Sequence, residues 1–127
     1  MNQQTHYILL ALGSNVAAEQ NIDHAKARLL AVFPQLQFSR SLITPAIGIV
    51  SPPFTNCLAE GYCSVQLEEV LVALKNIEAE MGSVSEERKK GIVKIDIDLL
   101  QFDATKRKAD DWSRDYIQLL LKELSGK

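Results

Sequence analysis

One segment of the sequence, Ile92–Phe102, alternates between apolar and polar residues and constrains the fold more strongly than any other. The alternating residues are Val93, Ile95, Ile97 and Leu99 on one parity and Lys94, Asp96, Asp98 and Leu100 on the other. Successive side chains of a β-strand point to opposite faces of its sheet, so the segment is predicted to be a half-buried strand. The chain is therefore expected to form a sheet with one buried face and one face that presents carboxylates.

The rest of the sequence indicates an alternation of strands and helices. Apolar periodicity predicts strands over His6–Leu12, Leu36–Thr44 and Phe54–Cys63, and helices over Ala17–Phe33, Ser64–Met81 and Asp111–Leu124. Ser64 is the expected N-cap of the second helix, and Gly82 fits just past its end. This order predicts an α+β fold of the ferredoxin-like βαββαβ type, with an antiparallel sheet and a C-terminal helix. The two inner helices then cover one face of the sheet and leave the other face free for a ligand.

Length and charge narrow the classes of function. The 127 residues are expected to form a single domain, 1–127. A formal net charge of −2 gives no bulk attraction for nucleic acid, so a polyanionic ligand must be held by local positive charge or by metal ions. The longest apolar run, Tyr7–Leu12, is far shorter than a membrane helix. No nucleic-acid or membrane partner is expected, and the protein is predicted to be cytoplasmic.

The cysteines predict neither a disulfide nor a zinc site. Cys57 and Cys63 lie six residues apart in one predicted strand, which separates their Cα atoms by about 20 Å. A disulfide requires a separation below about 7 Å, so both are expected to be unpaired, buried apolar residues. Neither His6 nor His24 lies at a zinc-ligand spacing from a cysteine.

The strongest candidate for a chemical site is Asp96-Ile97-Asp98. Residues two apart on a strand share a face, with Cα atoms about 6.5 to 7 Å apart, so both carboxylates can converge on divalent ions. Mg²⁺ prefers one or two carboxylates supplemented by phosphate oxygens and water, which suits a polyphosphate substrate. The alternative is that the two acidic residues only solubilise an exposed strand. Acidic residues are poor strand formers, and this favours the functional interpretation.

Two further motifs are less specific. Gly13-Ser14-Asn15 lies between a strand and a helix, as a phosphate-binding turn does, but the other glycines and the lysine of a P-loop are missing. An ordinary turn with Ser14 or Asn15 as the helix cap is the favoured interpretation. The basic run Arg88-Lys89-Lys90 precedes the acidic strand. It is either a solvated loop or lies within reach of a nucleotide held at the two aspartates.

Five motifs in register resemble one known family. They are Ala11-Leu12-Gly13-Ser14-Asn15, Thr44-Pro45-Ala46-Ile47-Gly48, Phe54-Thr55-Asn56, Ile77-Glu78-Ala79-Glu80-Met81-Gly82 and Ile95-Asp96-Ile97-Asp98-Leu99-Leu100. Over Tyr7–Phe102 the chain thus resembles 6-hydroxymethyl-7,8-dihydropterin pyrophosphokinase of folate biosynthesis. The resemblance implies that pyrophosphate is transferred from ATP to the hydroxymethyl group of a dihydropterin, with two Mg²⁺ ions as cofactors.

The resemblance also implies roles for individual residues. Asp96 and Asp98 match the metal-binding aspartates of the family, and Glu78 and Leu99 match positions near the nucleotide. The positions that match the pterin pocket are Thr44, Pro45 and Ile47 as its backbone strip, Phe54 as the stacking ring and Asn56 as the amide that reads the polar edge. These side chains fit their roles, because a flat heterocycle is bound by an aromatic face and fixed hydrogen bonds.

The chain departs from the family where phosphates are held. Ser83 and Ser85 replace two arginines, while Lys90 and Val93 replace a tryptophan and an arginine. A short polar stretch and the terminal helix stand in place of the family's C-terminal segment, which directs a histidine and an arginine toward ATP. A positioned arginine contributes about 10³- to 10⁵-fold to the rate of phosphoryl transfer, so these losses bear on activity.

Three functions are compatible with this pattern. In the first, the chain is a compact pyrophosphokinase in which Arg88, Lys89 and Lys90, together with Lys94 or Arg114, supply the missing positive charge. In the second, it is a catalytically eroded relative that binds pterin or nucleotide in a regulatory or interaction role. In the third, it is an unrelated ferredoxin-like module that binds a partner through its sheet edge.

Overall fold

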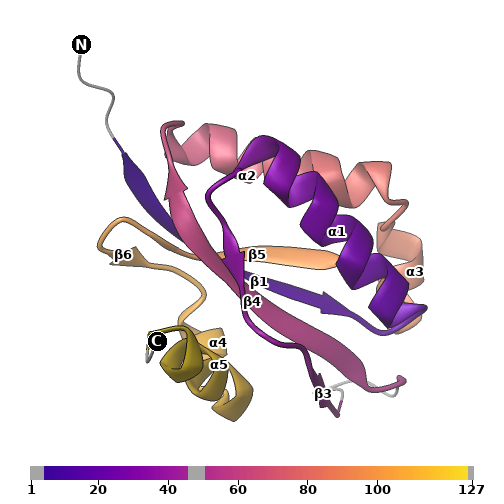
Figure 1. Cartoon of the computed structure of the whole chain (residues 1–127). Helices are drawn as coiled ribbons and strands as arrows, with labels where there is room; N and C mark the ends of the chain where they lie inside the picture. The colour runs from indigo at the N-terminus through magenta and orange to yellow at the C-terminus, as the bar shows by residue number, and fades with distance from the viewer. Residues whose placement is uncertain (1–4, 46–50, 126–127) are drawn as a thin grey trace.

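The computed structural model describes residues 5–45 and 51–125, in which six strands form one sheet with helices packed around it (Figure 1). The strands are β1 (His6–Ser14), β2 (Gln37–Phe38), β3 (Leu42–Thr44), β4 (Phe54–Cys63), β5 (Asp96–Phe102) and β6 (Thr105–Lys106). The helices are α1 (Ala18–Val32), α2 (Leu67–Glu80), α3 (Ser85–Lys89), α4 (Ala109–Trp112) and α5 (Asp115–Ser125).

The described strands pair antiparallel throughout, in the order β2-β4-β1-β5-β6, with β3 also paired to β4. The central strand β1 pairs with β4 on one side and with β5 on the other. The sequence therefore predicted the α+β class and the antiparallel sheet correctly. The strand with the two aspartates is shorter than expected, because β5 begins at Asp96 and not at Ile92.

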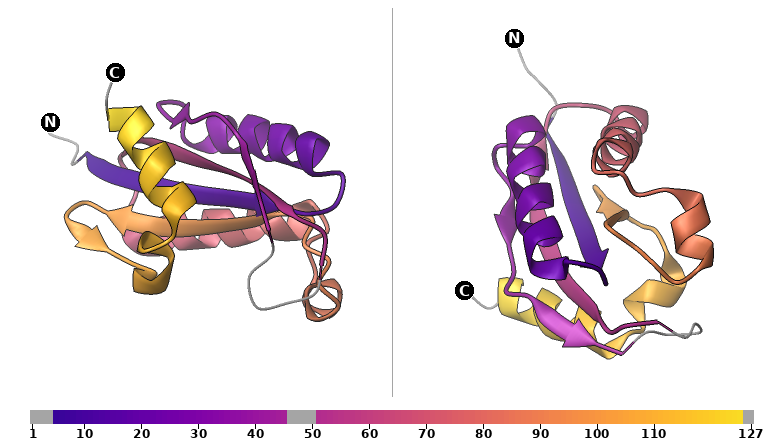
Figure 2. Two further views of the ribbon diagram at one scale, coloured as in Figure 1. Left: turned by 90° about the horizontal axis from the view of Figure 1, so that it is seen from below. Right: turned by 90° about the vertical axis from the view of Figure 1, so that its right-hand side faces the viewer.

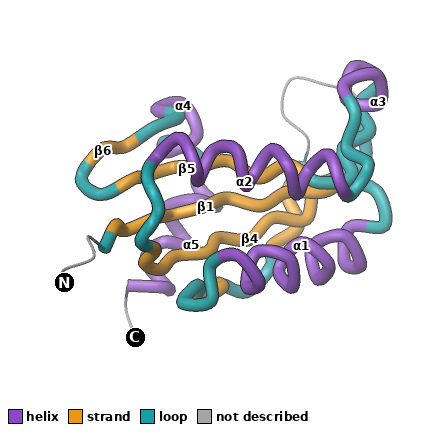
Figure 3. The backbone as a smooth tube through the Cα atoms, turned by 90° about the horizontal axis from the view of Figure 1, so that it is seen from above, coloured by secondary structure: helices purple, strands orange, loops and turns teal. Residues whose placement is uncertain are grey.

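One face of the sheet packs on α1 and α2, which lie side by side across it (Figure 3). The buried apolar residues of these helices recur at helical spacing: Ile22, Ala25 and Leu29 in α1, and Val70, Leu74 and Ile77 in α2. They contact the inward side chains of the central strands, including Leu10 and Leu12 of β1 and Ile97 of β5. Each fully buried side chain of this kind stabilises the fold by about 1.5 to 3 kcal/mol.

The opposite face of the sheet is not free, which corrects the expectation from the sequence. Helix α5 lies across it, on the side away from α1 and α2 (Figure 2). The second core consists of Leu9, Leu58 and Leu100 from the sheet and Ile117, Leu120 and Leu124 from α5. The apolar stripe of α5 requires such a partner, and the alternate residues of β1, β4 and β5 supply it. Asp96 and Asp98 share the face of Leu100 but precede it along β5, near the start of α5.

Several helix boundaries differ from those predicted. Helix α2 is capped by Gln66, which forms a capping box with Glu69, and not by Ser64. Gly82 does follow its end, with a φ of +79° that favours glycine. The predicted connection 83–91 contains the short helix α3, and the predicted terminal helix is divided into α4 and α5.

The cysteines are both unpaired, and Cys57 is buried as predicted, whereas Cys63 is only half-buried. No helix in residues 5–45 and 51–125 combines the length and the apolar character needed to cross a membrane.

Candidate active site

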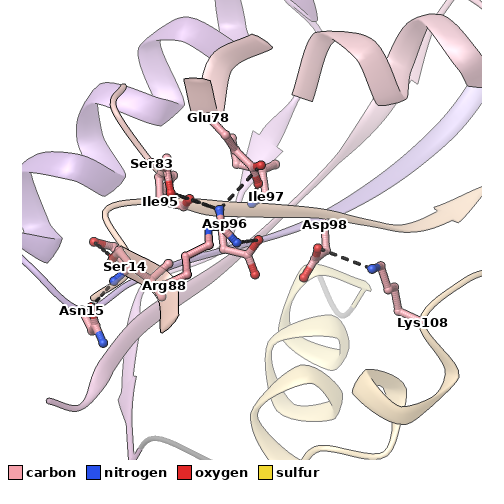
Figure 4. Close-up of polar contacts among 11 residues, drawn as sticks. Ser14, Asn15, Glu78, Ser83, Arg88, Ile95, Asp96, Ile97, Asp98 and Lys108 are labelled. Carbon is pink, nitrogen blue, oxygen red and sulfur yellow. Dashed lines mark hydrogen bonds and ion pairs between the residues drawn. The ribbon is translucent and has the colours of Figure 1, made fainter. Parts of the chain in front are cut away.

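Strand β5 holds Asp96 and Asp98 on one face because its other face is anchored in the core. Ile95, just before the strand, and Ile97 are almost fully buried beneath the helices. The two aspartates therefore point away from that core, with Asp96 opposite Gly13 and Asp98 opposite Ala11 of β1. Figure 4 shows both carboxylates on the same side of the strand.

Ser14 and Asn15 fix the segment that leads into β5, a role that the sequence did not indicate. The side-chain amide of Asn15 donates to the Gly91 carbonyl at 2.6 Å, and the backbone N–H of Val93 donates to the Asn15 side-chain oxygen at 2.7 Å. The Ser14 hydroxyl is fully buried and donates to the Val93 carbonyl at 3.4 Å. Neither residue caps α1, whose N-cap is Ala17 without a side-chain hydrogen bond. The favoured interpretation of this motif as a helix cap was wrong.

Asp98 lies in a partly buried position beside other carboxylates. Burial, together with the repulsion from the negative charges of Asp96 and Asp111, raises the pKa of Asp98 to about 7. A divalent cation between the carboxylates would remove this repulsion. In the described part of the chain no group of three or more His, Cys, Asp and Glu side chains could hold a metal ion. Two carboxylates on one face of a strand fit Mg²⁺, which accepts one or two carboxylates when phosphate oxygens and water complete its shell.

Each aspartate is paired with a cation from a different part of the chain (Figure 4). Arg88 of α3 places Nη1 3.1 Å from Oδ1 of Asp96, and its Nη2 donates to the Ile95 carbonyl at 2.9 Å and to the Ser83 hydroxyl at 3.0 Å. On the other side, Nζ of Lys108 lies 3.9 Å from Oδ1 of Asp98. The site therefore contains two acidic and two basic side chains.

Glu78 anchors β5 to α2. Its Oε2 accepts a hydrogen bond from the backbone N–H of Ile97 at 2.7 Å, and its Oε1 lies 3.6 Å from Nη2 of Arg88. Burial raises the pKa of this carboxyl, while the hydrogen bond from Ile97 lowers it. The side chain thus stabilises the position of the aspartates at the same time as it borders the adjacent cavity.

A cavity of about 560 Å³ lies on the α2 side of the pair. The predicted residues that line it are Glu78, Arg88, Asp96, Asp98 and Leu99. Sequence reasoning missed three of its cations, Lys75, Arg107 and Lys108. Lys75 is three residues before Glu78 on α2, a spacing that puts both on one helix face and was available as a signal. Lys89 and Lys90 are not among the lining residues, and their role as phosphate ligands stays a prediction.

Arg107 is held in place by its backbone. Its N–H donates to the Leu100 carbonyl at 2.7 Å, and its carbonyl accepts from the Trp112 indole at 2.8 Å. The Nε atom of Arg107 is buried and has no hydrogen-bond partner among the described residues. Arg107 also lines the larger cavity, where a guanidinium can pair with an anionic ligand.

A second cavity, of about 260 Å³, lies on the β4 side of the pair. It is lined by the predicted residues Thr44, Pro45, Phe54 and Asn56, and by Asp111, Arg114 and Tyr116 from the C-terminal part of the chain. The buried amide of Asn56 donates to the Thr44 hydroxyl at 2.7 Å. Ile47, the remaining residue of the predicted strip, lies outside the described residues.

Gly13 permits the close packing of this second cavity. A Cβ atom at its position would lie 3.2 Å from the side-chain oxygen of Asn56 and 3.7 Å from the Phe54 ring. A Cβ atom at this position would thus require a small shift of the Asn56 side chain, whereas its contact with the Phe54 ring would be ordinary. Asp96 and Asp98 line both cavities, so they form the wall that the two spaces share.

The comparison with protein families decides the identity of the chain. The model of the 7,8-dihydro-6-hydroxymethylpterin-pyrophosphokinase family matches residues 9–125. The chain belongs to this family. No curated protein sequence matches it. A crystal structure of an unknown protein from Galdieria sulphuraria is similar, with 19% sequence identity and a TM-score of 0.44. The match covers 78% of this chain and 50% of that one, so the chain spans about half the length of that protein.

This chain of the pyrophosphokinase family departs from the expected pattern at several positions. The side chains at two of them contact other parts of the protein. The Ser83 hydroxyl donates to the Ile95 carbonyl at 2.8 Å, and Val93 is buried. Lys94 precedes β5, and its Nζ lies 3.5 Å from Oε1 of Glu87, with which it forms an ion pair. Arg114 lines the second cavity, where it lies 3.5 Å from Asp111.

Proposed function

We propose that the protein transfers a pyrophosphoryl group from ATP to the hydroxymethyl group of 6-hydroxymethyl-7,8-dihydropterin, in folate biosynthesis, on a ferredoxin-like scaffold. One observation carries this proposal: Asp96 and Asp98 form the shared wall of two cavities. One cavity has cationic walls that suit a triphosphate, and the other has a ring, a buried amide and a hydroxyl that suit a pterin. A group held at the shared wall can pass from one ligand to the other.

The proposed step moves the β- and γ-phosphates together. The hydroxymethyl oxygen attacks the β-phosphorus of ATP, a new O–P bond forms, and the bond from the β-phosphorus to the oxygen bridging it to the α-phosphorus breaks. AMP leaves with that bridging oxygen, and the hydroxyl proton passes to solvent. Phosphoryl transfer of this kind depends on positioning and charge stabilisation.

The residues of the chain supply that positioning. Asn56 and Thr44 would orient the polar edge of the pterin, and Phe54 would stack on its ring. Lys75, Arg107 and Lys108 would hold the phosphates from the walls of the larger cavity. Asp96 and Asp98 would bind two Mg²⁺ ions, which neutralise charge on the β- and γ-phosphates when bound.

AMP release tests this function. Purified protein at high concentration, with Mg²⁺, ATP and the dihydropterin, is expected to release AMP in amounts equal to the pterin consumed. Asp96→Asn should abolish the release, whereas Asp110→Asn, a neutral replacement on the exposed face of α4, should retain it. Absence of AMP release from the unmodified protein would contradict the proposal.

A second candidate function is a binding module that retains the pterin cavity without turnover. It is favoured by Ser83, Ser85 and Val93, which leave three family arginines without a replacement at their own positions. Calorimetry separates the two functions. Pterin binding that is indifferent to Mg²⁺ and to α,β-methylene-ATP supports the binding module, and tighter pterin binding in the presence of both supports the enzyme.

A further inference from the structure

Asp96 and Asp98 are each neutralised by a cation that arrives from a different side of β5. Arg88 reaches Asp96 from α3, which precedes the strand, and Lys108 reaches Asp98 from the turn after β6 (Figure 4). Both cations also line the larger cavity. The same two side chains thus stand within reach of the carboxylates and of any phosphate bound beside them.

The backbones that carry these cations are fixed, but their side chains are not enclosed. Arg88 is held in α3 by its N–H to the Val84 carbonyl and by its own carbonyl, which accepts from Gly91. The residue before Lys108 is held by the Trp112 indole, and Lys106 lies 4.5 Å above the same ring. The side chain of Arg88 is 33% exposed and that of Lys108 is 51% exposed. Lys108 can change its partner by rotating side-chain bonds. Arg88 can do so without unfolding α3, but its Nη2 then gives up its hydrogen bonds to the Ile95 carbonyl and the Ser83 hydroxyl.

A divalent ion and these cations compete for the negative charge of the same carboxylates. Mg²⁺ binds carboxylate oxygen at about 2.1 Å. Nη1 of Arg88 lies 3.1 Å from Oδ1 of Asp96, so a metal ion on this carboxylate would be repelled by the guanidinium. Lys108, at 3.9 Å from Asp98, is the weaker competitor. A phosphate beside the metal offers each displaced cation a new anionic partner.

We infer that Arg88 and Lys108 are exchangeable counter-ions, which leave Asp96 and Asp98 when divalent metal binds and then pair with the phosphates of the nucleotide. This inference rests on the proposed function, because it assumes that the two aspartates bind metal. It makes metal and nucleotide binding mutually favourable. Bound metal releases the two cations from the aspartates so that they can pair with phosphate, and bound nucleotide draws the cations away from the aspartates so that they no longer repel the metal. It also supplies positive charge at a site that has Ser83, Ser85 and Val93 in place of arginines.

The test uses Mn²⁺ as the probe, with its binding to the full chain followed by electron paramagnetic resonance in the absence of nucleotide. Removing a competing cation should tighten Mn²⁺ binding, by about fivefold for Arg88→Gln and about twofold for Lys108→Gln, as expected for partly exposed ion pairs. Lys89→Gln is the matched control, because it removes the same charge from the next residue of α3 without removing a contact to either aspartate. It should change the affinity for Mn²⁺ much less.

The same variants should have the opposite effect on nucleotide. At saturating Mn²⁺, Arg88→Gln and Lys108→Gln are expected to weaken the binding of α,β-methylene-ATP, whereas Arg88→Lys should retain part of it. If Arg88 had a purely structural role, Arg88→Gln would weaken the binding of both Mn²⁺ and nucleotide. Mn²⁺ affinity that is unchanged or lower in Arg88→Gln would overturn the inference.

Two further variants separate this inference from the function on which it rests. If Asp96→Asn and Asp98→Asn leave Mn²⁺ binding unchanged, the aspartates do not bind metal, and both the proposed function and the inference fail. If they abolish Mn²⁺ binding while Arg88→Gln and Lys108→Gln do not tighten it, the inference alone fails.

Discussion

The two cavities that meet at Asp96 and Asp98 differ in how they relate to the family pattern. On the β4 side, Thr44, Pro45, Phe54 and Asn56 line the cavity at the positions that match the family motifs. On the α2 side, the expected arginines are absent, and cations from other positions surround the space, among them Arg107 and Lys108. The contrast thus concerns the cations: the smaller cavity keeps the matching ring and amide, whereas the cations of the larger cavity come from other positions.

Physical differences between the ligands account for this contrast. A flat heterocycle is recognised by hydrogen bonds of fixed direction, such as those of the buried Asn56 amide, and few positions of the fold can supply them. A polyphosphate is recognised largely by positive charge, which a long flexible side chain can deliver from several backbone positions. We therefore expect the smaller cavity, proposed to bind the pterin, to tolerate substitution less well than the larger cavity, proposed to bind the phosphates.

The largest effect is expected at the wall that the two cavities share. Asp96→Asn should lower the rate of AMP formation by at least about 10² to 10³-fold, because the group transferred is stabilised there. Steady-state assays with either substrate varied measure this loss. A variant that keeps more than a tenth of the activity would mean that the shared wall is not the place of transfer.

A smaller effect is expected on the pterin side alone. Asn56→Ala removes a buried amide and should weaken pterin binding by about 10- to 100-fold, while the affinity for α,β-methylene-ATP stays the same. Asn76→Ala, on the exposed face of α2, is the matched control and should change neither affinity. An equal loss for both ligands in Asn56→Ala would mean that the cavities are not independent.

The pH dependence of metal binding tests whether Asp98, in the wall that the two cavities share, binds the metal. Because burial and neighbouring carboxylates raise the pKa of Asp98 to about 7, a proton competes with metal below that pH. Mn²⁺ affinity should rise by up to about tenfold per pH unit as the pH approaches 7, and level off above it. Binding that is flat between pH 5.5 and 7.5 would show that Asp98 does not take part.

The smallest effect is expected on stability. Between the usual pKa of 3.8 and the raised value, the folded protein holds a proton on Asp98 that the unfolded chain has lost, so stability falls as the pH rises through this window. At pH 8 the ionised side chain remains destabilising. Asp98→Asn should therefore raise the free energy of unfolding at pH 8 by about 1 kcal/mol, reduced by solvent screening and by the pairing with Lys108. Urea unfolding at pH 5 and pH 8 measures this change, and a variant less stable than the parent at pH 8 would contradict it.

Periodicity in the sequence was enough to predict the long strands β1 and β4, the main helices and the placement of both aspartates on one face. It did not predict β6, and it gave β2 and β3 as one strand. It failed where a contact between distant segments determines the structure. Asn15, for example, does not cap the helix that follows it, because its side chain is engaged by Gly91 and Val93. The amphipathic pattern of α5 predicted that it packs on the domain, but not that it covers the second face of the sheet.

The candidate site was predicted in part, for a similar reason. Asp98 was predicted because its spacing from Asp96 on a strand itself indicates a function, and Asn56 because its motif resembles that of a known family. Arg107 and Lys108 were missed because they belong to a polar stretch without periodicity, and only the turn after β6 brings them to the cavity. The sequence could show that family arginines were absent, but not that other cations occupy the space.

Phosphorus NMR of the complete reaction tests the central claim most directly. With protein, Mg²⁺, ATP and 6-hydroxymethyl-7,8-dihydropterin, the three ATP signals should be replaced by the single signal of AMP and by two coupled signals of a pterin diphosphate ester. This result would show that the β- and γ-phosphates are transferred together from ATP to the pterin. Unchanged ATP with protein and substrates at equal concentrations, or the formation of ADP with a pterin monophosphate, would contradict the account.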